Sequence, residues 1–208
     1  MNSVEAAKAK AVDFIKKMQT EDGSWQDFLI SQVGLSDQWV TGYIGYVLQA
    51  QKDTMLCSSK AANWLLNTEL SGGGWGYNKE NLADADSTAN VIRFLSIFSH
   101  PTTRDLLYRW GNFLCSFQDA NTGGFITYKI EEDSIFAKSG WCKPEVSVSA
   151  MAGLALFGID REYYKKTLEQ VTYYLKKKSA CRWKLGFILV EWKFVWNELG
   201  LPVFTADG

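Results

Sequence analysis

The 208-residue sequence has little of what builds metal or redox sites. It contains one histidine and four cysteines, Cys57, Cys115, Cys142 and Cys181, and no CxxC pair. A single imidazole excludes a histidine-based metal cluster, and isolated cysteines are more typical of small buried hydrophobic residues than of zinc or disulfide chemistry. We therefore expect no bound metal and four reduced thiols. Only three prolines are present, which favours helices.

Long apolar runs and an excess of one charge are also missing. The 22 Lys and Arg residues nearly balance 23 Asp and Glu residues, which excludes nucleic acid as an electrostatic partner. No segment reaches the roughly 18 to 20 uncharged apolar residues that a membrane span needs. The start of the chain, residues 1–18, is charged and amphipathic and does not resemble a signal peptide. We expect a cytoplasmic protein with a single domain, residues 1–208.

Hydrophobic residues make up 47% of the chain and include nine tryptophans, enough for one sizeable core. Turns that join glycine to an aromatic residue recur at Trp25, Trp75 and Phe125, each 50 residues after the last. A weaker copy surrounds Trp183. A constant interval of this length indicates a repeated supersecondary unit, here two helices joined by a turn.

Two kinds of helix alternate along the chain. The first helix of each pair carries charges on one face, which predicts an outer, half-solvated layer; these helices are expected at residues 4–18, 59–67, 103–117 and 161–178. The second is richer in Ala, Gly and Ser, which predicts an inner layer packed on both sides; these are expected at residues 36–51, 86–99, 144–157 and 187–199. The predicted fold is all-α, with about four αα-hairpins side by side.

Each of the first three inner helices is expected to begin at an acidic residue. Asp37, Asp86 and Glu145 stand where free amide groups and the helix dipole favour a carboxylate. The repeat should bring the three to one end of the inner layer, as an acidic rim over an apolar and aromatic interior.

Two motifs resemble the squalene-cyclase-like superfamily, which includes class II terpene cyclases such as squalene-hopene cyclases. Gln19-Thr-Glu-Asp-Gly-Ser-Trp25 is similar to the QW repeat of that family, and the turns at Trp75 and Phe125 are similar to weaker copies. Asp84-Ala-Asp86-Ser87-Thr88-Ala89 is similar to its DxDDTA signature. The resemblance implies a partial or compact α/α toroid, an isoprenoid or polyene-like substrate, and Asp86 as the proton donor.

The candidate reaction is a cofactor-independent cyclisation, an isomerisation begun by protonating an alkene. It needs a strong acid, a dry cavity and aromatic faces that stabilise a carbocation. Asp86 is the candidate acid, and Asp84 the neighbour that sets its protonation. Candidate contacts to the hydrophobic substrate are Asp37, Trp39, Tyr43, Tyr77, Asn90, Arg93, Trp141, Glu145 and Trp192. In the family the QW aromatics lie outside and tie repeats together, so Trp25 is not included.

Other interpretations stay open on the same residues. Asp86 also suits an ordinary helix cap, Ser87 stands where the signature has a third Asp, and the only histidine, His100, is 14 residues beyond Asp86. These departures allow a non-catalytic scaffold that binds an apolar ligand or a partner subunit. Aromatic content and paired carboxylates also suit a carbohydrate-active α/α toroid. The apolar stretch 185–199 suits a core helix best, and leaves a homodimer face or a peripheral membrane contact as alternatives.

Overall fold

The computed structural model describes residues 3–31, 33–51, 53–97, 101–129 and 140–180. Within these ranges the chain is mostly helical, which confirms the predicted fold class. The outer helices are α1 (Ser3–Lys17), α3 (Met55–Asn67), α5 (Pro101–Cys115) and α7 (Lys165–Ala180). The inner helices are α2 (Gln38–Leu48), α4 (Ala85–Leu95) and α6 (Val146–Asp160). The fourth inner helix and the turn around Trp183 were predicted outside the described residues.

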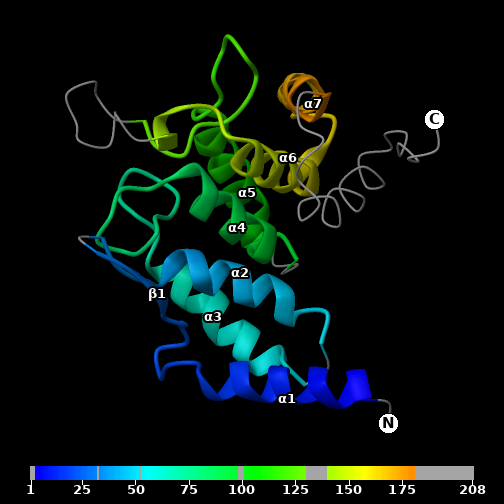
Figure 1. Ribbon diagram of the computed structural model, residues 1–208. Coiled ribbons are helices and arrows are strands. Elements are labelled where there is room, and N and C mark those ends of the chain that lie inside the picture. The colour runs from blue at the N-terminus through cyan, green and yellow to red at the C-terminus, as the bar shows by residue number, and fades with distance from the viewer. Residues whose placement is uncertain (1–2, 32, 52, 98–100, 130–139, 181–208) are drawn as a thin grey trace.

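The inner helices form one continuous layer. Helix α4 packs between α2 and α6, with α3 and α5 also against it, and α7 packs on α6. Figure 1 shows α2, α4 and α6 in succession, with α1 and α7 at opposite ends of the molecule. Nine of the eleven α4 residues are buried, whereas α1 buries none, as expected for inner and outer positions. No helix among the described residues is long and apolar enough to cross a membrane.

Small residues let α2 and α4 approach closely. A Cβ added at Gly45 would lie 2.6 Å from the Phe94 ring, and one at Gly42 would lie 2.8 Å from the Val91 side chain. The two glycines of α2 are therefore explained by its close packing on α4. Helix propensity does not explain them, because glycine is a poor helix former.

The three glycine-aromatic turns make equivalent contacts. The backbone N–H groups of Trp25, Trp75 and Phe125 donate to the hydroxyls of Thr41, Thr88 and Ser149 on the following inner helix, at 2.9, 3.0 and 2.8 Å. All three aromatic side chains are buried. The 50-residue interval in the sequence thus corresponds to one structural unit repeated three times.

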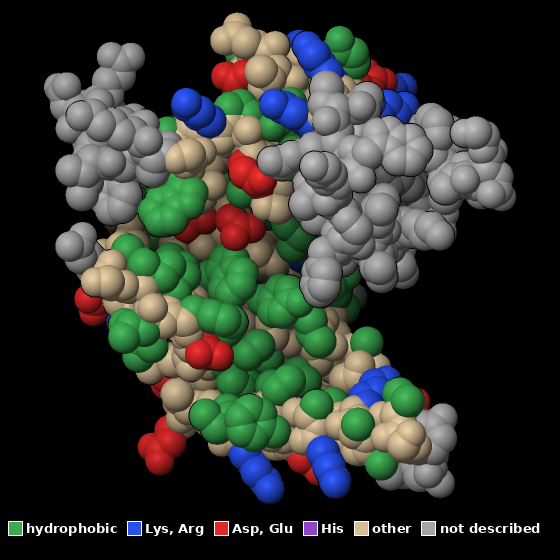
Figure 2. Space-filling view, in the orientation of Figure 1, with side chains coloured by type: hydrophobic (Ala, Val, Ile, Leu, Met, Phe, Trp, Pro, Cys, Tyr) green, Lys and Arg blue, Asp and Glu red, His purple; other side chains and the backbone are tan. Residues whose placement is uncertain are grey.

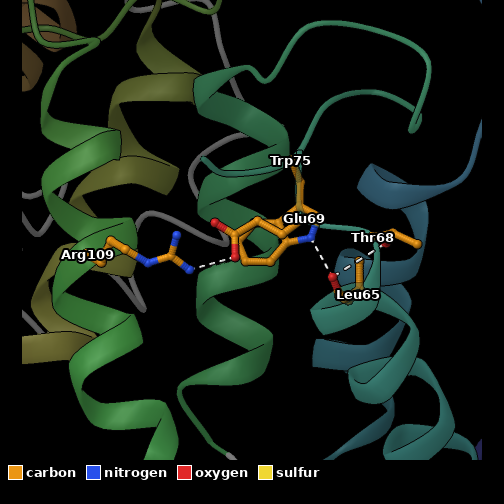
Figure 3. Close-up of polar contacts among 5 residues, drawn as sticks. All are labelled: Leu65, Thr68, Glu69, Trp75 and Arg109. Carbon is orange, nitrogen blue, oxygen red and sulfur yellow. Dashed lines mark hydrogen bonds and ion pairs between the residues drawn. The ribbon is translucent and has the colours of Figure 1, made fainter. Parts of the chain in front are cut away.

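The second turn also ties neighbouring outer helices together (Figure 3). The Trp75 indole donates to the Leu65 carbonyl oxygen at 2.8 Å, close to the end of α3. Glu69 follows α3 and forms a 2.7 Å ion pair with Arg109 on α5. In the first turn, Trp25 donates in the same way to Ile15 of α1.

Several helix bounds differ from the sequence prediction; for example, α3 begins at Met55 rather than at residue 59, and α4 ends at Leu95 rather than at residue 99. The outer helix predicted at residues 161–178 begins at Lys165, because the Asp160 carboxylate accepts the backbone N–H groups of Glu162 and Tyr163 and holds a turn there. A hairpin of two short strands, β1 (Asp27–Ile30) and β2 (Gly34–Ser36), precedes α2 and was not predicted. A 3-10 turn, Gly140–Cys142, precedes α6.

Candidate active site

The N-terminal ends of the inner helices carry the acidic residues, with one change from the predicted register. Asp37 caps α2, Asp84 caps α4 and Glu145 caps α6, each by accepting backbone N–H groups of the first turn. Asp84 takes the cap position in place of Asp86 because its backbone is extended, with ψ at 161°, and its carboxylate reaches the Ser87 N–H. Asp86 lies within the first turn, so its carboxylate is not used for capping.

The Asp84 carboxyl group is buried, and both of its oxygens accept hydrogen bonds. Its Oδ1 accepts from the Ser87 backbone N–H at 2.8 Å and its Oδ2 from the Ser87 hydroxyl at 2.7 Å. The Tyr128 hydroxyl is also hydrogen-bonded to it. Burial, together with the negative charge of Asp86, raises the pKa of Asp84 to about 7 against the opposing effect of the Ser87 hydrogen bonds. Ser87, the departure from the family signature, thus serves to hold Asp84.

The Asp86 carboxyl faces a different environment. The Trp39 indole N–H donates to its Oδ2 at 2.8 Å, and Asn90 Nδ2 donates to its backbone oxygen at 3.0 Å. Burial raises the pKa of Asp86, the Trp39 hydrogen bond opposes that effect, and the charge of Glu145 adds to it. Two carboxyl groups that interact in one low-dielectric place titrate as a pair.

Both carboxyl groups line a cavity of about 650 Å³. Its walls come from the β1–β2 hairpin, the segment that leads into α4, the loop after Phe125 and the start of α6. The lining residues are Phe28, Leu29, Ile30, Val33, Trp39, Tyr77, Asn81, Leu82, Asp84, Asp86, Ser87, Thr127, Tyr128, Trp141, Glu145, Ser147 and Val148. Figure 2 shows hydrophobic side chains gathered over α2 and the neighbouring hairpin, with acidic side chains beside them. The cavity therefore combines apolar and aromatic walls with carboxyl groups on one side.

Backbone pairing brings the distant loop to the α4 terminus. The Ala85 N–H donates to the Thr127 carbonyl at 3.0 Å, and the Thr127 N–H donates to the Trp141 carbonyl at 2.9 Å. Tyr128 and Trp141 pack at 6.1 Å between ring centroids. This pairing places Tyr128 at Asp84, although 44 residues separate them in the sequence.

Six of the predicted site residues share the cavity lining: Trp39, Tyr77, Asp84, Asp86, Trp141 and Glu145. Two more contact residues of the lining. Asn90 contacts Asp86, and the Tyr43 ring stacks on Trp39 with centroids 5.8 Å apart and planes 3° from parallel.

Asp37 and Arg93 also lie outside the lining. Asp37 is buried and accepts the Lys79 backbone N–H at 3.1 Å, and burial raises its pKa. Arg93 places its guanidinium 4.0 Å from the centre of the Tyr46 ring and donates to the Met151 sulfur at 3.3 Å. Trp192 lies outside the described residues.

Sequence reasoning missed Tyr128 and the hairpin residues Phe28–Val33. The only local signal for the hairpin was the short apolar run 28–30 before Gly34, too short to show periodicity. Tyr128 carried no signal, because it belongs to no motif and only the fold brings it to Asp84. In the part of the chain described, no group of three or more His, Cys, Asp or Glu side chains is arranged to hold a metal ion.

No protein-family profile matches the chain, and no curated protein matches it. Solved structures do. The type II terpene cyclase MstE from Scytonema, in its apo form, is 23% identical with a TM-score of 0.67, over 81% of this chain and 50% of that one. A protein from Actinoplanes is 27% identical with a TM-score of 0.63, over 82% of this chain and 51% of that one.

A variant of MstE in complex with its substrate, geranylgeranyl dihydroxybenzoate, is 23% identical with a TM-score of 0.63, over 77% of this chain and 47% of that one. The predicted likeness to class II terpene cyclases is thus confirmed at the level of the fold. The chain spans about half the length of these structures.

Proposed function

We propose that this protein is a class II terpene cyclase-like enzyme that isomerises an apolar isoprenoid chain by protonating one of its alkenes. The observation that carries the proposal is the Asp86 carboxyl group, which is not used as a helix cap and lines an apolar, aromatic cavity beside a second buried carboxyl. The proposal is supported by the fold, which is similar to that of the type II terpene cyclase MstE, a variant of which binds geranylgeranyl dihydroxybenzoate.

The hydrogen bonds support one placement of the proton within the pair. Asp84 receives the Ser87 N–H, the Ser87 hydroxyl and the Tyr128 hydroxyl at a helix N-terminus, and all of these stabilise a negative charge. Asp86 receives the Trp39 indole N–H at 2.8 Å and a longer side-chain contact from Asn90 at 3.5 Å. A single proton shared by the pair is therefore held by Asp86. Because the indole nitrogen only donates, Oδ2 acts as acceptor in the short 2.8 Å bond, whereas Oδ1 has only the 3.5 Å contact from Asn90, so we assign the proton to Oδ1.

The reaction follows from this placement. The π electrons of a substrate alkene take the Oδ1 proton to form a C–H bond, which leaves a carbocation on the substrate and a carboxylate on Asp86. Further alkenes of the chain attack the cation and form rings, and the last cation loses a proton to solvent. The Asp86 carboxylate takes a proton from solvent, which restores the acid for the next turnover. Product and substrate have the same mass. The rings of Phe28, Trp39 and Trp141 in the cavity wall stabilise positive charge, and the apolar wall keeps water from quenching it.

A binding protein without turnover is the second candidate. The observation that favours it is Ser87, which stands where the family signature has a third Asp and here holds the Asp84 carboxyl. A chain that binds an isoprenoid and leaves it unchanged would fit this observation.

The test is to incubate the full chain with prenylated aromatics such as geranylgeranyl dihydroxybenzoate, with prenyl diphosphates and with linear polyenes, and to search for products of unchanged mass. Asp86→Asn should abolish product formation, whereas Asp37→Asn, a cap outside the cavity lining, should retain it. Both variants should keep the wild-type helicity. Binding without any product would favour the second candidate, and full turnover by Asp86→Asn would refute the proposed role of Asp86.

A further inference from the structure

The β1–β2 hairpin contains a bulge at the cavity wall. The strands pair antiparallel, but the register shifts between Asp27 and Leu29, so Phe28 is an extra residue. Its φ angle is 53°, in the left-handed region that residues with a side chain rarely adopt. Bulges of this kind redirect a side chain, and they are frequent beside active sites.

Backbone contacts hold this conformation. The Phe28 N–H donates to Asp27 Oδ1 at 2.8 Å, and the Tyr77 hydroxyl donates to the Phe28 carbonyl oxygen. Neither contact involves the Phe28 ring. The bulge should therefore persist when the side chain is changed.

Burial of the side chain in the core does not explain why Phe28 adopts a positive φ angle. The Phe28 residue is 56% exposed, yet it lines the cavity, and its ring packs edge-on against Trp39 with centroids 5.8 Å apart. Trp39 in turn donates to Asp86. Tyr43 stacks on the same indole, so the rings of Phe28 and Tyr43 both pack against Trp39, the donor to Asp86.

We propose that Phe28 is a specificity-determining residue, whose ring narrows the cavity beside Asp86 so that only a slender alkene terminus reaches the carboxyl group. This inference rests on the proposed function. The group selected is the two-methyl end of an isoprenoid chain, in preference to ends that carry longer or bulkier substituents. A hydrophobic pocket discriminates one methylene group by about 10- to 200-fold, which is the size of effect expected here.

The test compares Phe28→Gly with wild type on two substrates, geranylgeranyl dihydroxybenzoate and an analogue whose terminal methyl groups are replaced by ethyl groups. Phe28→Gly should raise the ratio of kcat/KM for the analogue over the parent about tenfold or more. It should melt no lower than wild type, because glycine adopts a positive φ readily. Phe28→Tyr, which keeps the ring, should hold the wild-type ratio.

Leu35→Ala is the matched control, since Leu35 lies on the same hairpin, is 47% exposed and is not in the cavity lining. It should leave the ratio unchanged. An unchanged ratio in Phe28→Gly would overturn the inference, and so would an equal change in Leu35→Ala.

Binding separates this inference from the proposed function. If wild type converts neither compound, the cyclase proposal fails, and the ratio of the two dissociation constants, measured by calorimetry, still tests Phe28. Phe28→Gly should then shift the Kd ratio toward the analogue by a similar factor. A Kd ratio equal to that of wild type would contradict the role of Phe28 as well.

Discussion

At the scale of single residues, the site depends on two carboxyl groups that are held differently. Asp84 is 2% exposed and bound by Ser87 and Tyr128, whereas Asp86 lies in the cavity wall with Trp39 as its side-chain donor. The sequence predicted both residues but not this division, because the cap position depends on a backbone angle at Asp84 that no composition or spacing encodes. Tyr128 was unpredictable for a similar reason, since it reaches Asp84 only through long-range backbone pairing.

The raised pKa of Asp84 predicts that stability falls as pH rises. Between the ordinary aspartate value of 3.8 and about 7, the coupled Asp84–Asp86 pair of the folded chain holds a proton that the unfolded chain has lost. The free energy of unfolding should therefore decrease across this interval, by on the order of 2–4 kcal/mol, and level off above it. Asp84→Asn cannot ionise, so its stability should vary less with pH. Urea unfolding of both proteins at pH 4.5, 6 and 7.5 measures this, and parallel pH profiles would refute the assignment.

Removal of the Trp39 N–H should weaken the acid. Trp39→Phe keeps an aromatic wall but takes away the hydrogen bond that stabilises the Asp86 carboxylate and lowers its pKa. The pKa of Asp86 should rise, the rate should fall by about 10- to 100-fold, and the alkaline limb of the pH–rate profile should move to higher pH. Tyr43→Leu serves as the control, since it alters the stack on Trp39 but not the hydrogen bond. If Trp39→Phe lowers the rate but leaves the alkaline limb of the pH–rate profile in place, the effect of Trp39 is due to its packing and not to its hydrogen bond.

At the scale of secondary-structure elements, the alternation of outer and inner helices was predictable because the hydrophobic periodicity and the 50-residue interval both indicate it. Helix α4 is the clearest case, since its Ala and Ser positions are buried on both sides. The β1–β2 hairpin was not predictable, because its apolar residues number too few to show a period and the bulge at Phe28 interrupts the alternation.

The close contact of α2 and α4 predicts opposite effects for two glycine-to-alanine changes. Gly45→Ala should destabilise the protein by about 1–3 kcal/mol, because its Cβ would lie 2.6 Å from Phe94 in a packed interface. Gly158→Ala on α6 meets only the Ser96 hydroxyl at 3.9 Å, so the better helix propensity of alanine should stabilise by about 0.5–1 kcal/mol. Thermal melting of the two variants gives the comparison, and equal effects would contradict the packing described.

At the scale of the whole molecule, the repeated hairpins place the N-terminal ends of α2, α4 and α6 together, and this is why one end of the layer is acidic. The sequence predicted that gathering from the repeat. It did not predict how the wall of the cavity is shared between the hairpin, α4 and the loop at Tyr128, because non-local packing decides which side chains meet. The structural neighbours are about twice as long as this chain, and the partial or compact α/α toroid that the resemblance implies stays a prediction.

The most direct test of the account is a reaction carried out in deuterated water. If Asp86 delivers a solvent-exchanged proton to a substrate alkene, each molecule of cyclised product should carry one deuterium at the carbon first protonated, detected as a mass increase of about one unit and located by NMR. Asp86→Asn should form no such product while still binding the substrate. A cyclised product without deuterium, or labelled product formed equally well by Asp86→Asn, would contradict the account.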